Sequence, residues 1–501
     1  MSKQNGRIIG PDNVPTGAFG AASGVWKLSD VTDYKRQGTW PVALSGYQVA
    51  NSCRFDTNAG MNKTAANGTR TKATFSAWVK RSILGDESLL FNSRIDASNH
   101  FLIRFTGGDA LELVNRISGS NISFYTTNQL FRDVSAWYHV VWSIDTTQAS
   151  SGDRIKLFVN GTQVTSFATS TTQSQSTDLA ANINTAEYYV AQEYTSGDNY
   201  FDGYMAEVVW IDGTAYAASY FGETDSVTNN WVPKDVSGLT FGNSGFYLDF
   251  KDSSNLGNDA NGGTDLTENN ITSLDQSIDT CTNNFCTLNP LFPAGGTLTF
   301  SEGNTSISAP NDGNWKTTLS TISSQNGKFY MEFKSGGNYV MAGVCDFNVT
   351  SRGIDGDNFA TKTTISAYGY GYYNGDGSVR YEGGTEISNY GATYGDGDII
   401  GIALDCDNDK LYFSKNGVFQ NSGDPTSGST GTGAVSLNST AGRSWGFAFS
   451  IYQTNNRFAN FGSPSFAISS GNVDSSGMGN FEYPVPSGYY SLCTRNLNLI
   501  G

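Results

Sequence analysis

The sequence DCDND places a carboxylate at every second position, at Asp405, Asp407 and Asp409. Such alternation is typical of a calcium loop, which also needs a glycine after the third acidic position and a bidentate glutamate further on. Lys410 and Asn416 stand in those two places. The apolar residues on both sides of DCDND alternate as they do in strands, and Asp and Asn favour tight turns. We therefore expect a hairpin here and no metal site.

Paired carboxylates are a second candidate for chemistry, because a glycan hydrolase places two of them about 5 to 10 Å apart across the scissile bond. Glu207 and Asp212 are five positions apart, so a regular strand would direct them to opposite faces. Asp109 and Glu112 have the same difference of parity. We therefore predict that these carboxylates are structural, which makes a glycan depolymerase a less favoured function.

His139 is the one candidate for a general base within a well-patterned strand. It lies between Tyr138 and Val140, and no Ser or Cys stands near it in a nucleophile motif. The sequence also lacks a glycine-rich, lysine-terminated phosphate loop. We expect His139 to be structural and the protein not to be an enzyme.

The segment AYGYGYYNGDGSVRYEGG is the best candidate for binding. Its alternating tyrosines share one face of a predicted strand, and further polar and aromatic residues flank an Asn-Gly-Asp-Gly turn. A tyrosine ring is flat and apolar and carries a hydroxyl, which suits stacking on sugars or a wet protein interface. The predicted ligand-binding residues are Tyr372, Tyr373, Arg380 and Tyr381. The alternative is that these rings pack in a core.

Composition indicates the kind of fold that must position these residues. The chain has 501 residues, of which 58 are Gly and only 15% are charged. At about 150 residues per domain this length predicts two to four domains. Short segments of alternating apolar residues predict strands, and Asn160-Gly161 predicts a tight hairpin turn. The clearest strands are expected over 73–81, 100–105, 137–145 and 154–167, in an all-β two-sheet sandwich.

The charge of the chain disfavours several partners. The net charge is −16, which repels phosphate backbones and anionic lipid, so we expect no nucleic-acid partner. No apolar run approaches the ~18 residues that a spanning helix needs, so we expect no membrane insertion. The first residues also lack the apolar segment of a standard secretion signal.

The six cysteines are too few for a disulfide scaffold in a chain of this length. Cys281 and Cys286 bracket TNNF and could close a small local loop, although spacing alone leaves this pairing open. The two histidines, His100 and His139, are distant in sequence from these thiols, so a zinc site is not expected. We predict neither a metal nor a cofactor.

Several separated strings in the first half point to one family. TFSAWVKR, WYHVVWSIDTT with IKLFVNG downstream, and FDGYMAEVVWIDGTAYAASYFGE followed by WVPK occur in this order. They resemble the laminin-G/concanavalin A-like jelly roll, in the version found in tail-associated proteins of bacteriophages. The resemblance covers about residues 24–235, and the opening VWKLSDVTDYKRQGTWP is similar to a segment that begins such virion proteins.

The second half resembles a different binding module. GKFYMEFK, GDIIGIALDCDNDKLYFSKNG and RFANFGSPSF occur in the order typical of the SPRY domain, another concanavalin A-like sandwich. YPVPSGYYSLCTRNLN is similar to the closing segment of the same phage proteins. The expected organisation is an attachment arm, a laminin-G-like sandwich, an irregular connector, a SPRY-like sandwich and a closing segment, over 1–45, 46–235, 236–295, 296–470 and 471–501.

These resemblances imply a structural virion protein, made in the host cytoplasm, with two concanavalin A-like jelly-roll sandwiches. The implied function is that of a tail fibre or tail appendage that binds host-surface glycan or receptor. A capsid decoration or head-fibre protein is the alternative. The implied partners are other virion proteins of the tail or capsid, and two further copies in a homotrimer. The predicted attachment residues of the arm are Trp26, Tyr34, Arg36 and Trp40.

Overall fold

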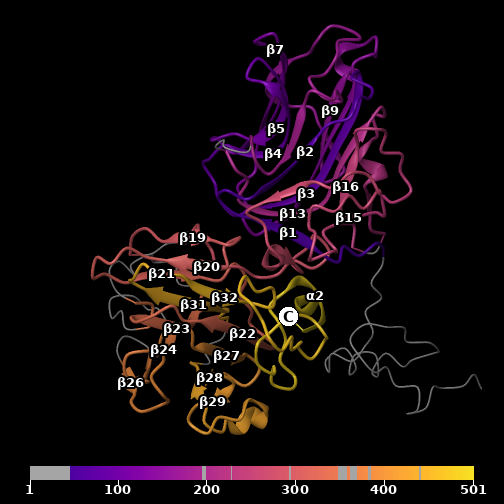
Figure 1. The fold of residues 1–501 in the computed structure, drawn as a ribbon. Helices are drawn as coiled ribbons and strands as arrows, with labels where there is room; N and C mark the ends of the chain where they lie inside the picture. Colours follow the sequence, from indigo (N-terminus) through magenta and orange to yellow (C-terminus); the bar gives the residue numbers. More distant parts are fainter. Residues whose placement is uncertain are drawn as a thin grey trace, which may run out of the picture. The chain divides into compact units, whose positions relative to one another are not determined.

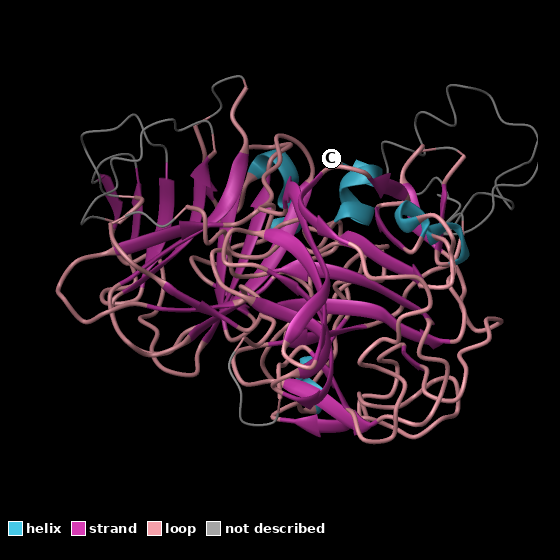
Figure 2. Ribbon diagram, turned by 90° about the horizontal axis from the view of Figure 1, so that it is seen from above, coloured by secondary structure: helices cyan, strands magenta, loops and turns pink. Residues whose placement is uncertain are grey.

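The computed structural model describes residues 46–194, 199–226, 228–292, 295–347, 358–360, 369–381, 385–438 and 442–500. Strands dominate these residues, and helix is limited to α2 (Thr494–Ile500) and short 3-10 turns (Figure 2). The described residues form a first unit, 46–284 with 300–304, and a second unit, 285–299 with 305–500. The all-β prediction is confirmed. Within the described part of the chain, no helix has the length and apolar character needed to cross a membrane.

The first unit is a sandwich of two antiparallel sheets (Figure 1). One has the strand order β10-β9-β8-β3-β13-β1-β18, with β16 also pairing with β13. The other has the order β11-β7-β6-β5-β4-β12-β2-β17, and β14 and β15 form a separate ribbon. The bounds are β1 (Ser52–Phe55), β2 (Gly60–Thr64), β3 (Lys72–Arg81), β4 (Ser88–Asp96), β5 (Asn99–Phe105), β6 (Ala110–Ile117), β7 (Ser120–Leu130), β8 (Tyr138–Asp145), β9 (Ile155–Val159), β10 (Thr162–Val164), β11 (Phe167–Thr171), β12 (Glu187–Val190), β13 (Gly203–Asp212), β14 (Gly222–Thr224), β15 (Trp231–Pro233), β16 (Phe246–Leu248), β17 (Thr267–Asn269) and β18 (Gln276–Ser277).

The core of the first unit lies between its two sheets. Period-2 alternation places Phe75 of β3 and Trp210 of β13 on the inner face of one sheet. Phe91 of β4 comes from the other sheet, and its ring centroid is 4.5 Å from that of Trp210. Stacked aromatic pairs of this kind are worth about 0.5–1.5 kcal/mol beyond their buried area.

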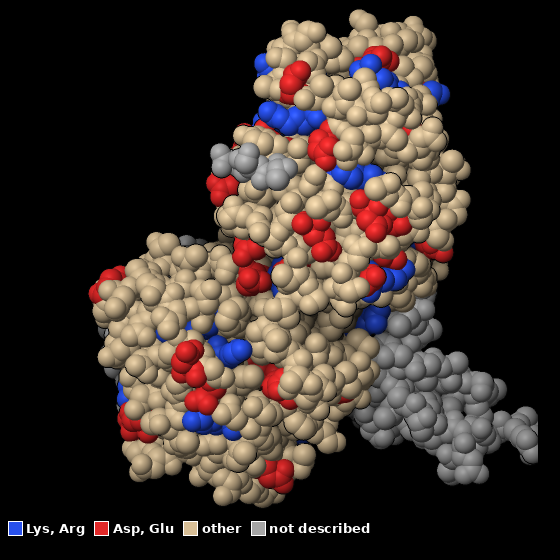
Figure 3. Space-filling model, viewed as in Figure 1, with Lys and Arg blue, Asp and Glu red and all other residues tan. Residues whose placement is uncertain are grey.

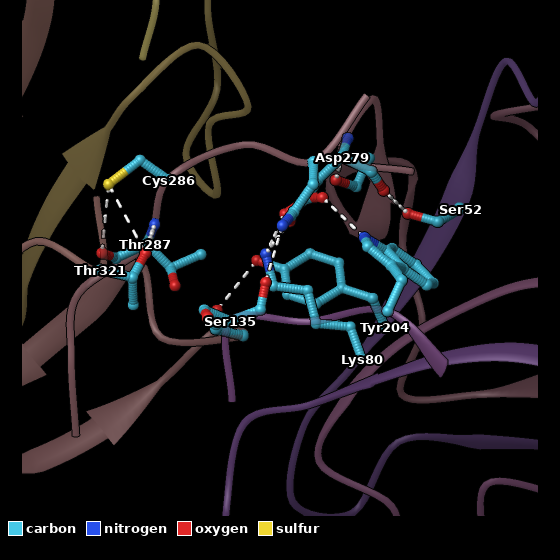
Figure 4. A network of polar contacts seen from close by, with 12 residues as sticks. Ser52, Lys80, Ser135, Tyr204, Asp279, Cys286, Thr287 and Thr321 are labelled. Carbon is cyan, nitrogen blue, oxygen red and sulfur yellow. Dashed lines mark hydrogen bonds and ion pairs between the residues drawn. The ribbon is translucent and has the colours of Figure 1, made fainter. Parts of the chain in front are cut away.

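Residues 236–284, which the sequence predicted as part of an irregular connector, are irregular apart from three short strands and one 3-10 turn. The structure assigns them to the first unit, where they supply β16, β17 and β18 to the two sheets. The buried ammonium of Lys80 donates to Asp279 Oδ2 at 2.8 Å and to Asn284 Oδ1 at 2.7 Å (Figure 4). Trp137 Nε1 donates to the other oxygen of Asp279, and Ser52 Oγ to its carbonyl. A network of charge-assisted hydrogen bonds therefore fixes this segment on the sandwich.

The second unit is also a two-sheet antiparallel sandwich. One sheet contains the strand order β20-β32-β22-β27-β28-β29 with β30 beside β28, and the other has the order β21-β31-β23-β24-β25-β26. The strand β19 (Thr299–Ser301) lies at the boundary between the units along the chain. The remaining bounds are β20 (Ser306–Ser308), β21 (Lys316–Leu319), β22 (Lys328–Lys334), β23 (Val340–Asp346), β24 (Gly369–Tyr373), β25 (Val379–Tyr381), β26 (Thr385–Ile387), β27 (Ile399–Asp405), β28 (Lys410–Lys415), β29 (Val418–Phe419), β30 (Val435–Ser436), β31 (Trp445–Ile451) and β32 (Arg457–Asn460).

Residues 471–500 belong to the second unit and cover one of its sheets. Phe481 and Tyr489 of this segment pack with Tyr330 of β22 and Tyr412 of β28 in one buried cluster. The carboxylate of Glu332, which is fully buried, accepts backbone N–H bonds from residues 482 and 483 at 2.9 and 2.8 Å. The closing segment therefore completes the second sandwich.

Both predicted hairpin turns form. Asn160 and Gly161 have φ of 47° and 78°, the positive values that a type I′ turn needs at both central residues. The DCDND segment joins β27 to β28, with Asp405 paired to Lys410. Asp405 accepts from Asn408, and Asp407 from the backbone N–H of Gly327, so these carboxylates hold the turn. The hairpin prediction is confirmed.

Candidate functional site

The structure places Tyr372 in the core of the second unit. Tyr372 belongs to β24 and its side chain is fully buried. Its ring contacts Tyr394 and Phe413, and its hydroxyl donates to the carbonyl of Ala392. The prediction that Tyr372 contacts a ligand is therefore replaced by the alternative that it packs. Its alternation partner Tyr370 is buried too, 5.7 Å from Trp445 between ring centroids.

The other three predicted residues are half-buried at the edge of the same sheet. Tyr381 stacks on Tyr370 with centroids 5.4 Å apart and planes 9° from parallel. The guanidinium carbon of Arg380 lies 4.3 Å from the centroid of the Tyr373 ring. Tyr373 and Arg380 are thus brought together on the outer face of the sheet, whereas Tyr381 mainly covers a buried ring.

Strand register brings further aromatic residues to Tyr373. Lys316 of β21 and Val340 of β23 both pair with Ile451 of β31. The residues just outside these positions are Trp315, Tyr339 and Tyr452, so the three lie side by side at one end of the sheet. Tyr373, opposite Met341 on β24, extends the row. We call Trp315, Tyr339, Tyr373 and Tyr452 the aromatic platform.

The rings of the aromatic platform are in mutual contact. The centroid of Tyr452 lies 4.1 Å from that of Tyr339 and 5.1 Å from that of Trp315. The ring centroids of Trp315 and Tyr373 are 6.1 Å apart, and both side chains pack on the buried cluster around Met341. Tyr339 is 39% exposed and the other three rings are half-buried. The platform is therefore a cluster of contacting, partly exposed rings at the end of the sheet.

The backbone of Tyr339 is held in an unusual conformation. Its φ is 56°, in the left-handed region that a bulky residue rarely adopts. Asn374 accepts from the backbone N–H of Val340 at 3.0 Å and donates to the carbonyl of Gly337 at 3.3 Å. These bonds fix the chain on both sides of Tyr339. Backbone strain that the surroundings impose in this way is concentrated at functional sites.

A buried arginine joins the two loops of the platform. Arg457 donates to the carbonyl of Asn338, in the loop of Tyr339, at 2.9 Å. It also donates to the carbonyls of Gln453 and Asn455, in the loop of Tyr452, at 3.0 and 2.6 Å. Burial lowers the pKa of Arg457 to about 10, so it stays charged at neutral pH. Arg457 therefore sets the position of one loop relative to the other.

Sequence reasoning did not identify Trp315 or Tyr339 as site residues, and Tyr452 was not among its four predicted ligand-binding residues. All three stand one residue outside a strand, which is a weak signal until the pairing of the strands is known. The predicted attachment residues Trp26, Tyr34, Arg36 and Trp40 lie outside the described residues.

Cys281 and Cys286 are not joined by a disulfide in the structure. Cys281 packs in the first unit with Val49 and Trp78. Cys286 lies in the second unit, where its thiol is 3.6 Å from Thr321 Oγ1 (Figure 4). Each thiol therefore has a packing role of its own in the structure.

His139 has a serine neighbour that the sequence did not reveal. Its Nε2 lies 3.0 Å from Ser76 Oγ on the adjacent strand. Trp231 Nε1 donates to its Nδ1 at 2.9 Å, so the proton of the neutral ring is on Nε2 and is donated to Ser76. A serine nucleophile needs the opposite direction of hydrogen bonding. Burial also lowers the pKa of His139 to about 3, and the pair is structural.

Glu207 occupies a bulge rather than a regular strand position. The pairing of β13 with β3 shifts between Ala206 and Val209, and Glu207 has a φ of 52°. Its carboxylate accepts from Tyr247 at 2.7 Å and from Tyr47 at 3.4 Å. Asp212 instead accepts from the backbone N–H of Thr69. The two carboxylates have separate structural partners, in agreement with the sequence argument.

One family model and several solved structures are similar to parts of this chain. The model of the concanavalin A-like lectin/glucanases superfamily, in its laminin-G version, matches residues 55–218. Among solved structures, the SPRY domain of human HERC1 is 15% identical, with a TM-score of 0.26, and the match covers 34% of this chain and 96% of that one. Domain 4 of AbnA, a GH43 extracellular arabinanase from Geobacillus stearothermophilus, in complex with arabinotriose, is 19% identical, with a TM-score of 0.26 and 34% and 78% covered. No curated protein sequence matches.

Proposed function

We propose that the protein is a non-enzymatic appendage of a bacteriophage virion that binds host-surface glycan through the aromatic platform. The observation that carries this proposal is the platform itself, four contacting rings at one end of a sheet. Aromatic rings that are held by one another and by a core beneath them offer contact area at low conformational-entropy cost. Sandwich folds commonly bind through such strand ends and loops.

The carbohydrate part of the proposal has support from the comparisons. Residues 55–218 match a superfamily whose description includes lectins, and one neighbouring structure holds arabinotriose. The fold alone does not define a ligand. The argument for glycan therefore rests on the aromatic platform, and the fold makes it a reasonable scaffold.

The virion part of the proposal rests on the sequence strings of residues 24–235 and of the closing segment, which resemble tail-associated phage proteins. Copies would assemble as a homotrimer and attach to other virion proteins, so that several weak glycan sites act together through a high effective concentration. The sequence carries neither shaft repeats nor coiled-coil heptads. This observation favours a second candidate, a capsid decoration or head-fibre protein.

A glycan array with the purified protein tests the binding proposal. We expect signals that are lost in Tyr339→Ala, Tyr373→Ala and Tyr452→Ala. Tyr220→Ala is the matched control, because Tyr220 is 50% exposed on the first unit and its loss should not change glycan binding by the platform. Loss of binding in the control alone, or binding that is indifferent to the three platform changes, would overturn the proposal.

Immunogold labelling of intact particles tests the location. Gold at the tail supports the appendage, and gold spread over the head favours the decoration protein. The absence of gold from the particles would overturn the proposal that this is a virion protein.

A further inference from the structure

The cations around the aromatic platform are all engaged by other groups within the described residues. Arg380 pairs with Asp376 at 2.7 Å and with Glu386 at 3.8 Å. Lys316, which follows Trp315, places its ammonium 2.8 Å from both oxygens of Asp312. Two cations thus face three carboxylates beside the platform.

The third cation of this region, Arg457, is fully buried. Two of its guanidinium nitrogens donate to three backbone carbonyls. Its charge lies beneath the loops that carry Tyr339 and Tyr452 and is not presented at the surface. Among the residues that the structure describes around the platform, an acidic sugar would therefore meet no cation whose hydrogen bonds are available for its carboxylate or sulfate.

Part of the rim of the platform carries uncharged polar side chains. The loop residues next to its rings include Asn314, Asn338, Thr454 and Asn455, all of them exposed. Amide and hydroxyl groups donate and accept hydrogen bonds without charge, which matches the hydroxyls of a sugar. On the face of the molecule drawn in Figure 3, too, most of the surface belongs to uncharged residues.

The rings of the platform converge on one another. Its residues stand at the ends of the four neighbouring strands β21, β31, β23 and β24. The ring centroids of Trp315 and Tyr373, from the two outermost of these strands, are nevertheless only 6.1 Å apart. The platform therefore gathers four rings into one compact cluster.

We infer that the aromatic platform selects uncharged glycans and discriminates against sialylated and sulfated ones. This inference rests on the proposed glycan-binding function and adds the class of ligand. The rings would stack on the apolar faces of neutral sugars, and the amides of the rim would bond their hydroxyls. Because no exposed, unpaired cation contributes among the described residues of this surface, binding should depend little on salt.

The test measures binding of neutral oligosaccharides and of their sialylated and sulfated derivatives, at low and at high salt. We expect at least about tenfold tighter binding of the neutral member of each pair, with little change between the two salt conditions. Platform-dependent binding of the acidic members that equals or exceeds the neutral ones would overturn the inference and leave the proposed function intact. Absence of any platform-dependent glycan binding would overturn both.

A gain-of-function variant sharpens the test. Asp376→Asn combined with Glu386→Gln releases Arg380 from its two carboxylates while its stacking on Tyr373 is retained. We expect affinity for acidic oligosaccharides to rise several-fold and affinity for neutral ones to stay unchanged. Glu223→Gln is the control, because Glu223 pairs with Lys234 on the first unit. An unchanged preference in the double variant, with neutral binding retained, would show that the paired carboxylates do not set the selectivity.

Discussion

The ring of Tyr339 lies against the ring of Tyr452, with centroids 4.1 Å apart, although the backbone of Tyr339 has a left-handed φ of 56°. An L-residue in this region costs about 1–2 kcal/mol. Asn374 and Arg457 hold the loop in this conformation through bonds on both sides of it. The second unit thus maintains backbone strain that presents a partly exposed ring.

Tyr339→Asn should weaken glycan binding with little effect on the stability of the protein. Asparagine tolerates left-handed backbone, so relief of strain offsets the lost ring contact, which is worth about 0.5–1.5 kcal/mol. We expect the free energy of unfolding to stay within about 1 kcal/mol of the native value, while glycan affinity falls at least about tenfold. Urea unfolding and glycan titration measure the two effects. A loss of more than about 3 kcal/mol would mean that the ring is structural.

Glu207 should make the first unit less stable as the pH rises. Burial raises the pKa of Glu207 from 4.5 to about 7, so between these values the folded protein keeps a proton that the unfolded chain has lost. The stability contributed by Glu207 therefore decreases from pH 4.5 to pH 7, by an amount on the order of 2–3 kcal/mol.

Glu207→Gln removes this titration and can still accept from Tyr247. Unfolding of both proteins, measured at about pH 5 and about pH 8, should show a smaller pH effect in the variant. Glu223→Gln, at an exposed carboxylate, provides the comparison. Equal pH dependence in the native protein and Glu207→Gln would contradict the role of Glu207.

Local chemistry made part of the fold predictable. Asn160-Gly161 and the DCDND turn have sequences that favour positive φ whatever the rest of the chain does. Alternation likewise showed that Tyr370 and Tyr372 share a face. It did not show which face is buried, because that depends on the sheet packed against it, and Tyr372 turned out to be core.

Other features depend on contacts between residues distant in sequence. The bulge at Glu207 is compatible with many strand sequences, and the aromatic platform exists only because three separate strands pair at Ile451. The segment around Asp279 is rich in polar residues, which favours irregular backbone, yet its bonds with Lys80 fix it on the first unit. Polar composition alone does not reveal such partners.

His139 should stay neutral with its proton on Nε2. Burial lowers its pKa from 6.5 to about 3, so in this window the unfolded chain binds a proton that the folded protein does not. Stability due to His139 is therefore complete above about pH 6.5 and is lost as the pH falls towards 3. Imidazole ¹⁵N shifts measure the tautomer directly, and with two histidines in the chain His139→Gln assigns the signal.

Trp231→Phe provides the matching variant, because it removes the N–H that bonds Nδ1 of His139. We expect the free energy of unfolding to fall by about 1–3 kcal/mol, because a buried nitrogen loses its hydrogen-bond partner. Glycan binding should stay unchanged, since the platform is on the second unit. A native signal with the proton on Nδ1 would contradict the assignment of Ser76 as an acceptor.

Phe481 should anchor the closing segment to the second sandwich. Its fully buried ring lies 5.3 Å from that of Tyr330, centroid to centroid, and the neighbouring backbone bonds the buried carboxylate of Glu332. Phe481→Ala should therefore destabilise the second unit by about 3–5 kcal/mol. Val473→Ala, in the same segment but at a side chain that is 50% exposed, should change stability by less than about 0.5 kcal/mol. Amide hydrogen exchange in β22 measures the stability of the second unit, and exchange in β3 measures that of the first unit. Equal effects of both changes, or loss of protection in β3 as well, would contradict the assignment of the closing segment to the second unit.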